Sequence, residues 1–147
     1  MLFRSVDRVC RDIKDARLAG IKVLPISLNF SRLDFDSLNL ADEVFNCLNK
    51  YGIDKDAIHI EVTESTLSEN DDKLKEELKS FRSQGYALWL DDFGSGYSGL
   101  NVLKEYDFDL IKIDMKFLSN FEGNTKARQI LKNIIKLAKE LGMQTLT

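Results

Sequence analysis

Apolar side chains recur at helical spacing in four segments of the chain, and each segment ends near a glycine. The segments cover residues 7–18, 37–51, 71–84 and 125–141, and they are followed by Gly20, Gly52, Gly85 and Gly142. A glycine in this place can adopt the left-handed conformation that ends a helix. The pattern therefore predicts four amphipathic helices, and the last three have candidate N-cap residues in Asp36, Asp71 and Asn124.

Short apolar runs alternate with these helices, at residues 23–29, 57–62, 86–90, 110–113 and 143–146. Such alternation predicts βα units with parallel strands, and residues 98–106 would form a short helix between the third and fourth strands. A complete eight-stranded barrel needs about 250 residues. The chain therefore predicts an α/β fold of about five parallel βα units, either an open sheet or a partial TIM-like (βα) barrel with open edges.

Composition narrows the class of protein. The chain has 147 residues, of which 44% are hydrophobic and 31% are charged, as in one ordinary globular domain. A net charge of −3 without a run of basic residues makes duplex nucleic acid a poor candidate partner. The apolar runs are too short to span a membrane and no signal peptide is visible, so a cytoplasmic domain is expected. Cys10 and Cys47 lie in helix-like segments and are expected to be core residues.

Polar residues able to bind metal or carry protons gather where the predicted strands end. They are Asn29, then Glu61 and Glu64, then Asp91 and Asp92, and finally Lys112 and Asp114. The carboxyl ends of parallel strands share one edge of a sheet, so these side chains should meet there. Amide and carboxylate oxygens suit Mg²⁺ or Mn²⁺, and adjacent aspartates repel each other without a cation. The pattern predicts a metal site suited to phosphoester displacement.

Each of these residues also has a purely structural interpretation. The Asp91-Asp92 pair could form a turn and N-cap, residues 61–65 could end a strand and cap a helix, and Lys112 could point to solvent. In a site, Lys112 would orient an attacking hydroxide or offset phosphate charge. His59 and Trp89 are expected to be ordinary strand residues that pack. The convergence of four successive strand ends is what favours a functional site.

Four motifs in this order resemble one known family. They are Ser27-Leu28-Asn29-Phe30-Ser31, Ile60-Glu61-Val62-Thr63-Glu64-Ser65, Asp91-Asp92-Phe93-Gly94-Ser95-Gly96-Tyr97-Ser98 and Lys112-Ile113-Asp114. Together they resemble the EAL-type phosphodiesterase domain, a modified TIM barrel that linearises cyclic di-GMP to pGpG. The long acidic loop motif is the most specific of the four.

The resemblance implies a role for each matching residue. Asn29, Glu61 and Asp91 would bind one Mg²⁺ or Mn²⁺ ion, and Asp91 and Asp92 would hold a second. Lys112 would contact the hydrolytic water, Asp114 would support the site, and Glu64 would anchor the glycine loop after Asp92. We therefore expect Lys112, Asp92 and Glu64 to act in catalysis, and the metal ligands to be Asn29, Glu61, Asp91, Asp92 and Asp114.

The resemblance also predicts that residues 1–147 form a single incomplete domain. No Glu-Ala-Leu motif occurs in the chain, and the family's Glu-Gly-Val-Glu motif would follow Thr147. The first strand and the C-terminal βα units would thus be missing, together with two glutamates of the site. We expect the chain alone to have little activity, its open sheet edges to promote self-association, and any membrane anchor to lie elsewhere in a parent protein.

Two other functions fit parts of the pattern. A non-catalytic member of the same family could bind cyclic di-GMP or a protein partner without turnover. A phosphoacceptor receiver domain also has five βα units, an acidic pair and a lysine at a strand end. In that fold the acidic pair ends the first strand, whereas here it ends the third of five, so the receiver is the weaker hypothesis.

Overall fold

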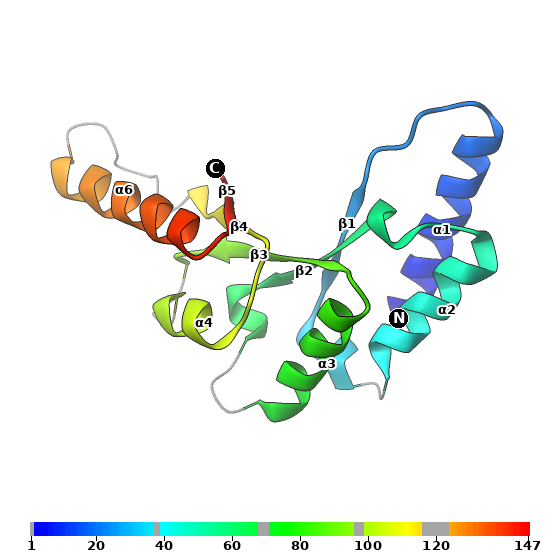
Figure 1. Cartoon of the computed structure of the whole chain (residues 1–147), viewed down its shortest axis with the longest axis horizontal. Helices are drawn as coiled ribbons and strands as arrows, with labels where there is room; N and C mark the ends of the chain where they lie inside the picture. Colours follow the sequence, from blue (N-terminus) through cyan, green and yellow to red (C-terminus); the bar gives the residue numbers. More distant parts are fainter. Residues whose placement is uncertain (1, 37–38, 68–70, 96–98, 116–123) are drawn as a thin grey trace.

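Five parallel strands form a single sheet in this computed structural model, which describes residues 2–36, 39–67, 71–95, 99–115 and 124–147 (Figure 1). The helices are α1 (Leu2–Leu18), α2 (Leu40–Tyr51), α3 (Asp72–Ser83), α4 (Gly99–Glu105) and α6 (Thr125–Glu140). The strands are β1 (Ile26–Phe30), β2 (Ile58–Thr63), β3 (Ala87–Phe93), β4 (Leu110–Ile113) and β5 (Gln144–Leu146). Three short 3₁₀ helices complete the described chain: η1 (Arg32–Asp36), η2 (Lys55–Ala57) and η3 (Glu64–Thr66).

The strands are hydrogen-bonded in sequence order, β1-β2-β3-β4-β5, and every pair is parallel. Each strand therefore lies beside the next one along the chain, as in a (βα) barrel. A receiver domain interchanges its first two strands, which gives the order 2-1-3-4-5. The observed order confirms the predicted barrel-like fold and excludes the receiver.

The predicted helix ends are largely correct. Gly20, Gly52, Gly85 and Gly142 all have φ between 66° and 86°, in the left-handed region. The Asp71 side chain accepts a hydrogen bond from the Leu74 backbone N–H at 3.1 Å, as an N-cap should. Asn124 caps α6 in the same way, through the backbone N–H of Ala127 at 3.0 Å.

Several boundaries differ from the prediction. Helix α1 begins at Leu2 and not at residue 7, and strand β1 covers Ile26–Phe30 and not residues 23–29. Asp36 is not the N-cap of α2, because it lies at the end of η1; the residue before α2 is Asn39, with φ 62°. Residues 37 and 38, where this helix was expected to begin, lie outside the described residues. The strand expected at 86–90 continues as β3 to Phe93, so Asp91 and Asp92 are part of the strand.

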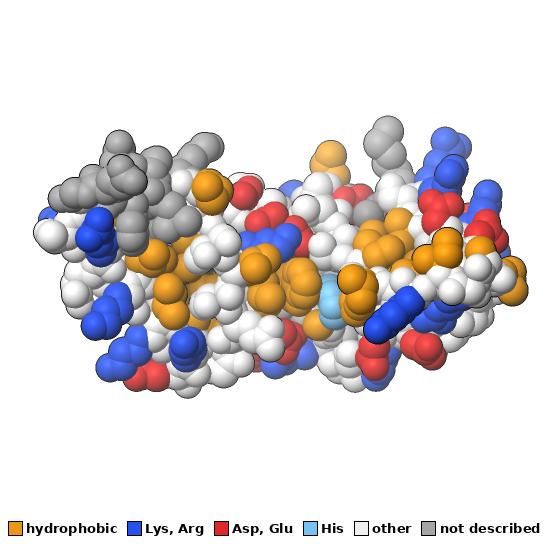
Figure 2. Space-filling model, turned by 90° about the horizontal axis from the view of Figure 1, so that it is seen from above, with side chains coloured by type: hydrophobic (Ala, Val, Ile, Leu, Met, Phe, Trp, Pro, Cys, Tyr) orange, Lys and Arg blue, Asp and Glu red, His pale blue; other side chains and the backbone are white. Residues whose placement is uncertain are grey.

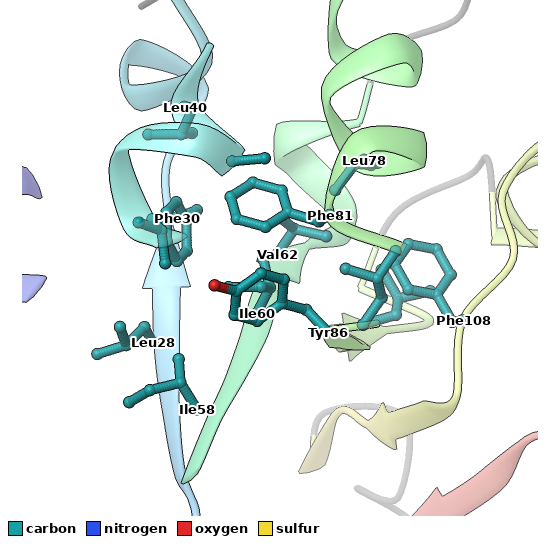
Figure 3. Close-up of a cluster of buried hydrophobic side chains, with 14 of the residues drawn as sticks. Leu28, Phe30, Leu40, Ile58, Ile60, Val62, Leu78, Phe81, Tyr86 and Phe108 are labelled. Atoms are coloured by element: carbon teal, nitrogen blue, oxygen red, sulfur yellow. The ribbon is translucent and has the colours of Figure 1, made fainter. Parts of the chain in front are cut away.

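One face of the sheet is covered by helices and holds the core. Side chains of alternate strand residues point to this face, and Figure 3 shows Leu28, Phe30, Ile58, Ile60 and Val62 among them. Phe81 of α3 is fully buried there, with ring-centroid distances of 5.7 Å to Phe30 and 5.5 Å to Tyr86. The sheet is thus held rigid from this side.

Both cysteines are buried with free thiols, Cys10 on α1 and Cys47 on α2, which agrees with their predicted place in the core. Burial raises the pKa of the Cys10 thiol to about 12, so this thiol stays protonated at neutral pH. Among the described helices, none has the length and apolar character needed to cross a membrane.

Phe81→Ala should lower the free energy of unfolding by about 3–5 kcal/mol, because it leaves a cavity between helix α3 and the sheet. Urea denaturation measures this change. Phe45→Ala is the matched control, since Phe45 is 47% exposed and should lose less than about 1 kcal/mol. Similar losses in both variants would show that the core is not centred on Phe81.

Candidate active site

The sheet face opposite the core carries the predicted site. Residues next to the buried strand positions point to this face, because side chains alternate along a strand. Asn29 of β1 lies opposite Glu61 of β2 in the strand register, and Asp91 of β3 lies opposite Thr63. Lys112 of β4 lies between the buried residues Ile111 and Ile113 in the sequence. Its side chain therefore points away from the core, to the same face as Asn29, Glu61 and Asp91.

Four strands bring four of the predicted residues into contact. The Lys112 Nζ atom lies 2.6 Å from Glu61 Oε1 and 3.8 Å from Asp91 Oδ2. The Asn29 side-chain amide donates a hydrogen bond to Glu61 Oε1 at 3.2 Å. Glu61 is therefore the centre of the arrangement, with an ammonium and an amide at one of its oxygens.

The two carboxyl groups of the cluster have shifted pKa values in opposite directions. Burial is the largest single influence on the pKa of Glu61, whose side chain is 3% exposed, and it raises that pKa. The Lys112 ammonium, together with the polar side chains of Ser27 and Asp91, lowers the pKa more than burial raises it, so it lies below the usual value. The pKa of Asp91 is raised, first by burial and then by the neighbouring Glu61 carboxyl group. Glu61 is thus the carboxylate that stays ionised, and Asp91 is the one that takes up a proton first.

The donor set fits a hard divalent cation. Glu61 Oε2 is buried and has no hydrogen-bond partner among the described residues. A buried carboxylate oxygen without a partner is costly, and coordination of a cation would satisfy it. Oxygen atoms from Asn29, Glu61 and Asp91 are also the ligand type that Mg²⁺ and Mn²⁺ prefer.

Only two of the three clustered oxygen donors are carboxyl groups, since the third is the amide of Asn29. Within the described ranges, no group of three or more His, Cys, Asp or Glu side chains is placed to hold an ion. The Lys112 ammonium lies beside both carboxyl groups and supplies positive charge to them. A divalent ion would have to take over this charge balance from Lys112.

Asp92 has an unusual backbone conformation. Its φ is 55°, in the left-handed region, and its side chain is exposed. Its backbone N–H donates to Asp91 Oδ1 at 2.9 Å, and its carbonyl accepts from Ser95 N at 3.1 Å. Such a conformation is costly for a non-glycine residue and is found preferentially at functional sites. That Asp92 binds a second metal ion together with Asp91 stays a prediction.

Glu64 fastens the start of the glycine loop. It is 2% exposed, and its Oε2 accepts a hydrogen bond from the backbone N–H of Gly94 at 2.9 Å. Gly94 has φ 93°, a conformation that side chains other than glycine rarely adopt. Gly96, Tyr97 and Ser98 of the same motif lie outside the described residues.

Asp114 lies one residue beyond β4, next to the end of β3. Its backbone N–H donates to the Phe93 carbonyl at 3.1 Å, which ties the ends of these two strands together. The hydrogen bond holds Asp114 at the edge of the sheet where the site lies. Its supporting role in metal binding stays a prediction.

Two aromatic residues beside the cluster were expected only to pack. The Trp89 ring lies 5.7 Å from Lys112 Nζ and stacks on His59, with ring centroids 4.5 Å apart. His59 precedes Glu61 by two positions, and Trp89 precedes Asp91 by two positions. Both rings therefore point to the same face as these acidic residues. This spacing was the sequence signal that places both rings on the face of the site.

Comparison with known proteins points to one family. The family model for the EAL domain matches residues 4–147. The cyclic di-GMP phosphodiesterase NbdA of Pseudomonas aeruginosa is 32% identical over 137 residues, which cover 93% of this chain and 18% of NbdA. MucR of the same organism, a bifunctional diguanylate cyclase and cyclic di-GMP phosphodiesterase, is 30% identical over 95% of this chain and 20% of its own length.

Solved structures show the same fold. The PaMucR phosphodiesterase in complex with c-di-GMP superposes with a TM-score of 0.80 at 29% identity, over 97% of this chain and 62% of that chain. A calcium and cyclic di-GMP complex of Klebsiella pneumoniae BlrP1 has a TM-score of 0.83 at 24% identity, over 97% of this chain and 36% of that chain. The chain therefore spans about a fifth of the curated relatives named above.

Lys112→Met should lower the free energy of unfolding by about 3 kcal/mol at pH 7, because it leaves the Glu61 carboxylate buried without its ammonium. Without Lys112 the pKa of Glu61 rises above its unfolded value. The cost is therefore present at neutral pH and disappears as the pH falls through that raised pKa. Urea denaturation at several pH values measures both effects.

Lys75→Met is the matched control for this prediction. Lys75 Nζ also lies 2.6 Å from a carboxylate oxygen, but the side chain of its partner Glu105 is 32% exposed. An ion pair at the surface contributes about 1 kcal/mol or less to the free energy of unfolding. Equal losses in the two lysine variants would contradict the view that Glu61 is a buried charge dependent on Lys112.

Proposed function

Because the chain belongs to the EAL domain family, we propose that it forms the metal- and lysine-bearing part of an active site that hydrolyses cyclic di-GMP to linear pGpG. The observation that carries the proposal is the convergence of Asn29, Glu61 and Lys112 on one sheet face, beside Asp91. Relatives such as NbdA and MucR are cyclic di-GMP phosphodiesterases, which supports this choice of substrate.

The cluster offers the oxygen donors that such an enzyme needs for metal ions. Asn29, Glu61 and Asp91 would hold one Mg²⁺ or Mn²⁺ ion, Asp91 and Asp92 a second, and Asp114 would support them. When bound, these ions supply Lewis acidity toward the phosphodiester and lower the pKa of a bound water molecule. The buried, unpartnered Oε2 of Glu61 supports its place in this ligand set.

Lys112 then has a role in the chemical step. Its ammonium lies within hydrogen-bond distance of Glu61, and the Lys112 side chain is 24% exposed, which supports contact with a molecule at the sheet face. From this position Lys112 would donate a hydrogen bond to the attacking water and offset the negative charge that develops on the phosphate. It performs both tasks without giving up its proton.

Glu64 would keep the loop after Asp92 in position. The hydrogen bond from Gly94 N–H to Glu64 fixes the first residue of the loop, next to the strand that carries both aspartates. The glycine permits a close approach of the backbone to a bound nucleotide. Glu64 would thus act on the reaction through the loop and not through contact with the phosphate.

The described strands would be one part of a larger barrel. The chain matches 62% of the PaMucR phosphodiesterase, and a complete barrel of eight strands needs about 250 residues. We therefore propose that residues 1–147 are an incomplete EAL domain, and that the rest of the domain supplies further metal ligands and substrate contacts. The chain alone is expected to bind weakly and to turn over slowly, since its ligand set is partial.

A chimeric barrel tests the catalytic proposal. The part of the PaMucR phosphodiesterase that matches this chain is replaced by residues 4–147, and conversion of cyclic di-GMP to pGpG is measured with Mg²⁺ or Mn²⁺. We expect metal-dependent turnover, abolished by a chelator, and a loss of at least about 100-fold in Lys112→Met or Glu61→Gln. Lys75→Met, far from the site, should leave turnover unchanged.

A folded chimera without turnover would contradict the enzyme proposal. If calorimetry then shows that it still binds cyclic di-GMP, the domain is a non-catalytic receptor for the nucleotide. Turnover by the 147-residue chain alone, at the rate of PaMucR measured in parallel, would contradict the proposal that the domain is incomplete.

We also propose self-association through the sheet edges. Within the described part of the chain, β1 and β5 each pair with a neighbour on one side only. Figure 2 shows hydrophobic side chains exposed along much of one face of the molecule, between groups of charged side chains. Leu146 of β5 is 51% exposed at such an edge. Unpaired strands and exposed apolar groups promote association.

Light scattering at tens of micromolar protein should therefore give a mass above the 16.8 kDa of one chain. Leu146→Lys should move the mass toward the monomer, because it places a charge at the β5 edge. Leu33→Lys is the control, since Leu33 is also exposed, at 78%, but lies in η1. A strict monomer at this concentration would refute the proposal.

A further inference from the structure

Lys112 has a neighbour on the sheet face that is not a carboxyl group. Its Nζ atom lies 5.7 Å from the centre of the Trp89 ring. A cation within about 6 Å of an indole face is attracted by the negative potential of that face. Lys112 is therefore held from two directions, by Glu61 on β2 and by Trp89 on the strand between them.

The Trp89 ring is itself supported from the next strand. It stacks on the His59 ring, with centroids 4.5 Å apart and an angle of 20° between the planes. Stacking of this kind restricts rotation of a ring. His59, Trp89 and Lys112 thus form a column that crosses β2, β3 and β4 beside the cluster of Asn29, Glu61 and Asp91.

The two attachments of Lys112 respond differently to a cation. In the proposed function, on which this step rests, Glu61 and Asp91 turn their oxygens to a divalent ion. That ion would repel the Lys112 ammonium and weaken its attraction to Glu61. The face of Trp89 does not take part in metal binding, so it continues to attract the ammonium.

We infer that Trp89, supported by His59, is a positioning residue for Lys112. Its ring keeps the ammonium beside the reacting phosphate when the carboxylates are occupied by metal. Removal of the ring leaves the charge of Lys112 intact but lets its four-carbon side chain sample other directions. Trp89 needs no contact with the substrate for this role.

The chain contains a natural control for the inference. Lys75 has a similar pair of neighbours away from the site, with Glu105 Oε2 at 2.6 Å and the Tyr106 ring at 5.8 Å. Its side chain is 25% exposed, against 24% for Lys112. An external reagent can therefore reach both lysines, and the rate of each in the unaltered chain is the reference for that lysine in the variants.

Acetylation of the full chain by acetic anhydride tests the positioning role. Mass spectrometry follows the labelling rates of Lys112 and Lys75 in one sample, in the presence of Mg²⁺ and without nucleotide. Trp89→Leu should raise the labelling rate of Lys112 by about three- to tenfold and leave Lys75 unchanged. Trp89→Phe keeps a ring face and should give a smaller increase, and His59→Ala should lie between the two.

Tyr106→Leu is the reciprocal control, and it should raise labelling of Lys75 only. The inference is overturned if labelling of Lys112 in Trp89→Leu changes no more than that of Lys75. It is also overturned if Trp89→Phe behaves as Trp89→Leu does, since packing alone would then explain the effect. If Trp89→Leu does not fold, the Trp89→Phe and His59→Ala variants decide the outcome.

Turnover in the chimeric barrel gives a second, independent readout. Trp89→Leu should lower kcat by about three- to tenfold with little change in KM, and should have no further effect in the Lys112→Met background. An equal loss in that background would contradict action through Lys112. If the chimera has no turnover at all, the proposed function fails, while the labelling rates still decide the positioning role.

Discussion

The ion pair between Glu61 and Lys112 is the interaction on which the site depends. Glu61 lies on β2 and Lys112 on β4, so their contact at 2.6 Å spans β3 and requires the three strands to lie in sequence order. The Glu61 side chain is 3% exposed, and a carboxylate so deeply buried is stable only with a compensating charge. Asn29 on β1 and Asp91 on β3 lie next to this ion pair, because these two strands flank β2 in the sheet. Fold and site are therefore linked through one buried charge.

The charge balance of the cluster also defines its chemistry. Glu61 stays ionised because Lys112 lowers its pKa, whereas burial and Glu61 raise the pKa of Asp91. The arrangement is neutralised by a side chain of the protein itself, although its oxygen donors suit a divalent ion. Metal binding would then be an exchange of one cation for another, and the ammonium released from Glu61 would be directed toward the substrate. Trp89 is placed to receive it.

Much of this could be predicted from the sequence, because the strongest signals were local. Glycines marked the ends of helices, and β4 begins and ends where its apolar run does. The meeting of Asn29, Glu61 and Lys112 followed from a general property of parallel strands. Two predictions failed because tertiary contacts decide these positions. Asp36 ends η1 and does not cap α2, and β3 continues through Asp92, which has a left-handed conformation. The contact between Trp89 and the Lys112 ammonium could not be predicted, because it depends on the distance between side chains on two different strands.

The most direct test of the central claim is Mn²⁺ binding to the chain without nucleotide, measured by electron paramagnetic resonance. If Glu61 is a metal ligand compensated by Lys112, Glu61→Gln should weaken Mn²⁺ binding by at least about tenfold, because a charged oxygen donor is lost. Glu105→Gln, which alters the surface ion pair with Lys75, should bind as the unaltered chain does. Equal affinity in the unaltered chain and Glu61→Gln would contradict the account.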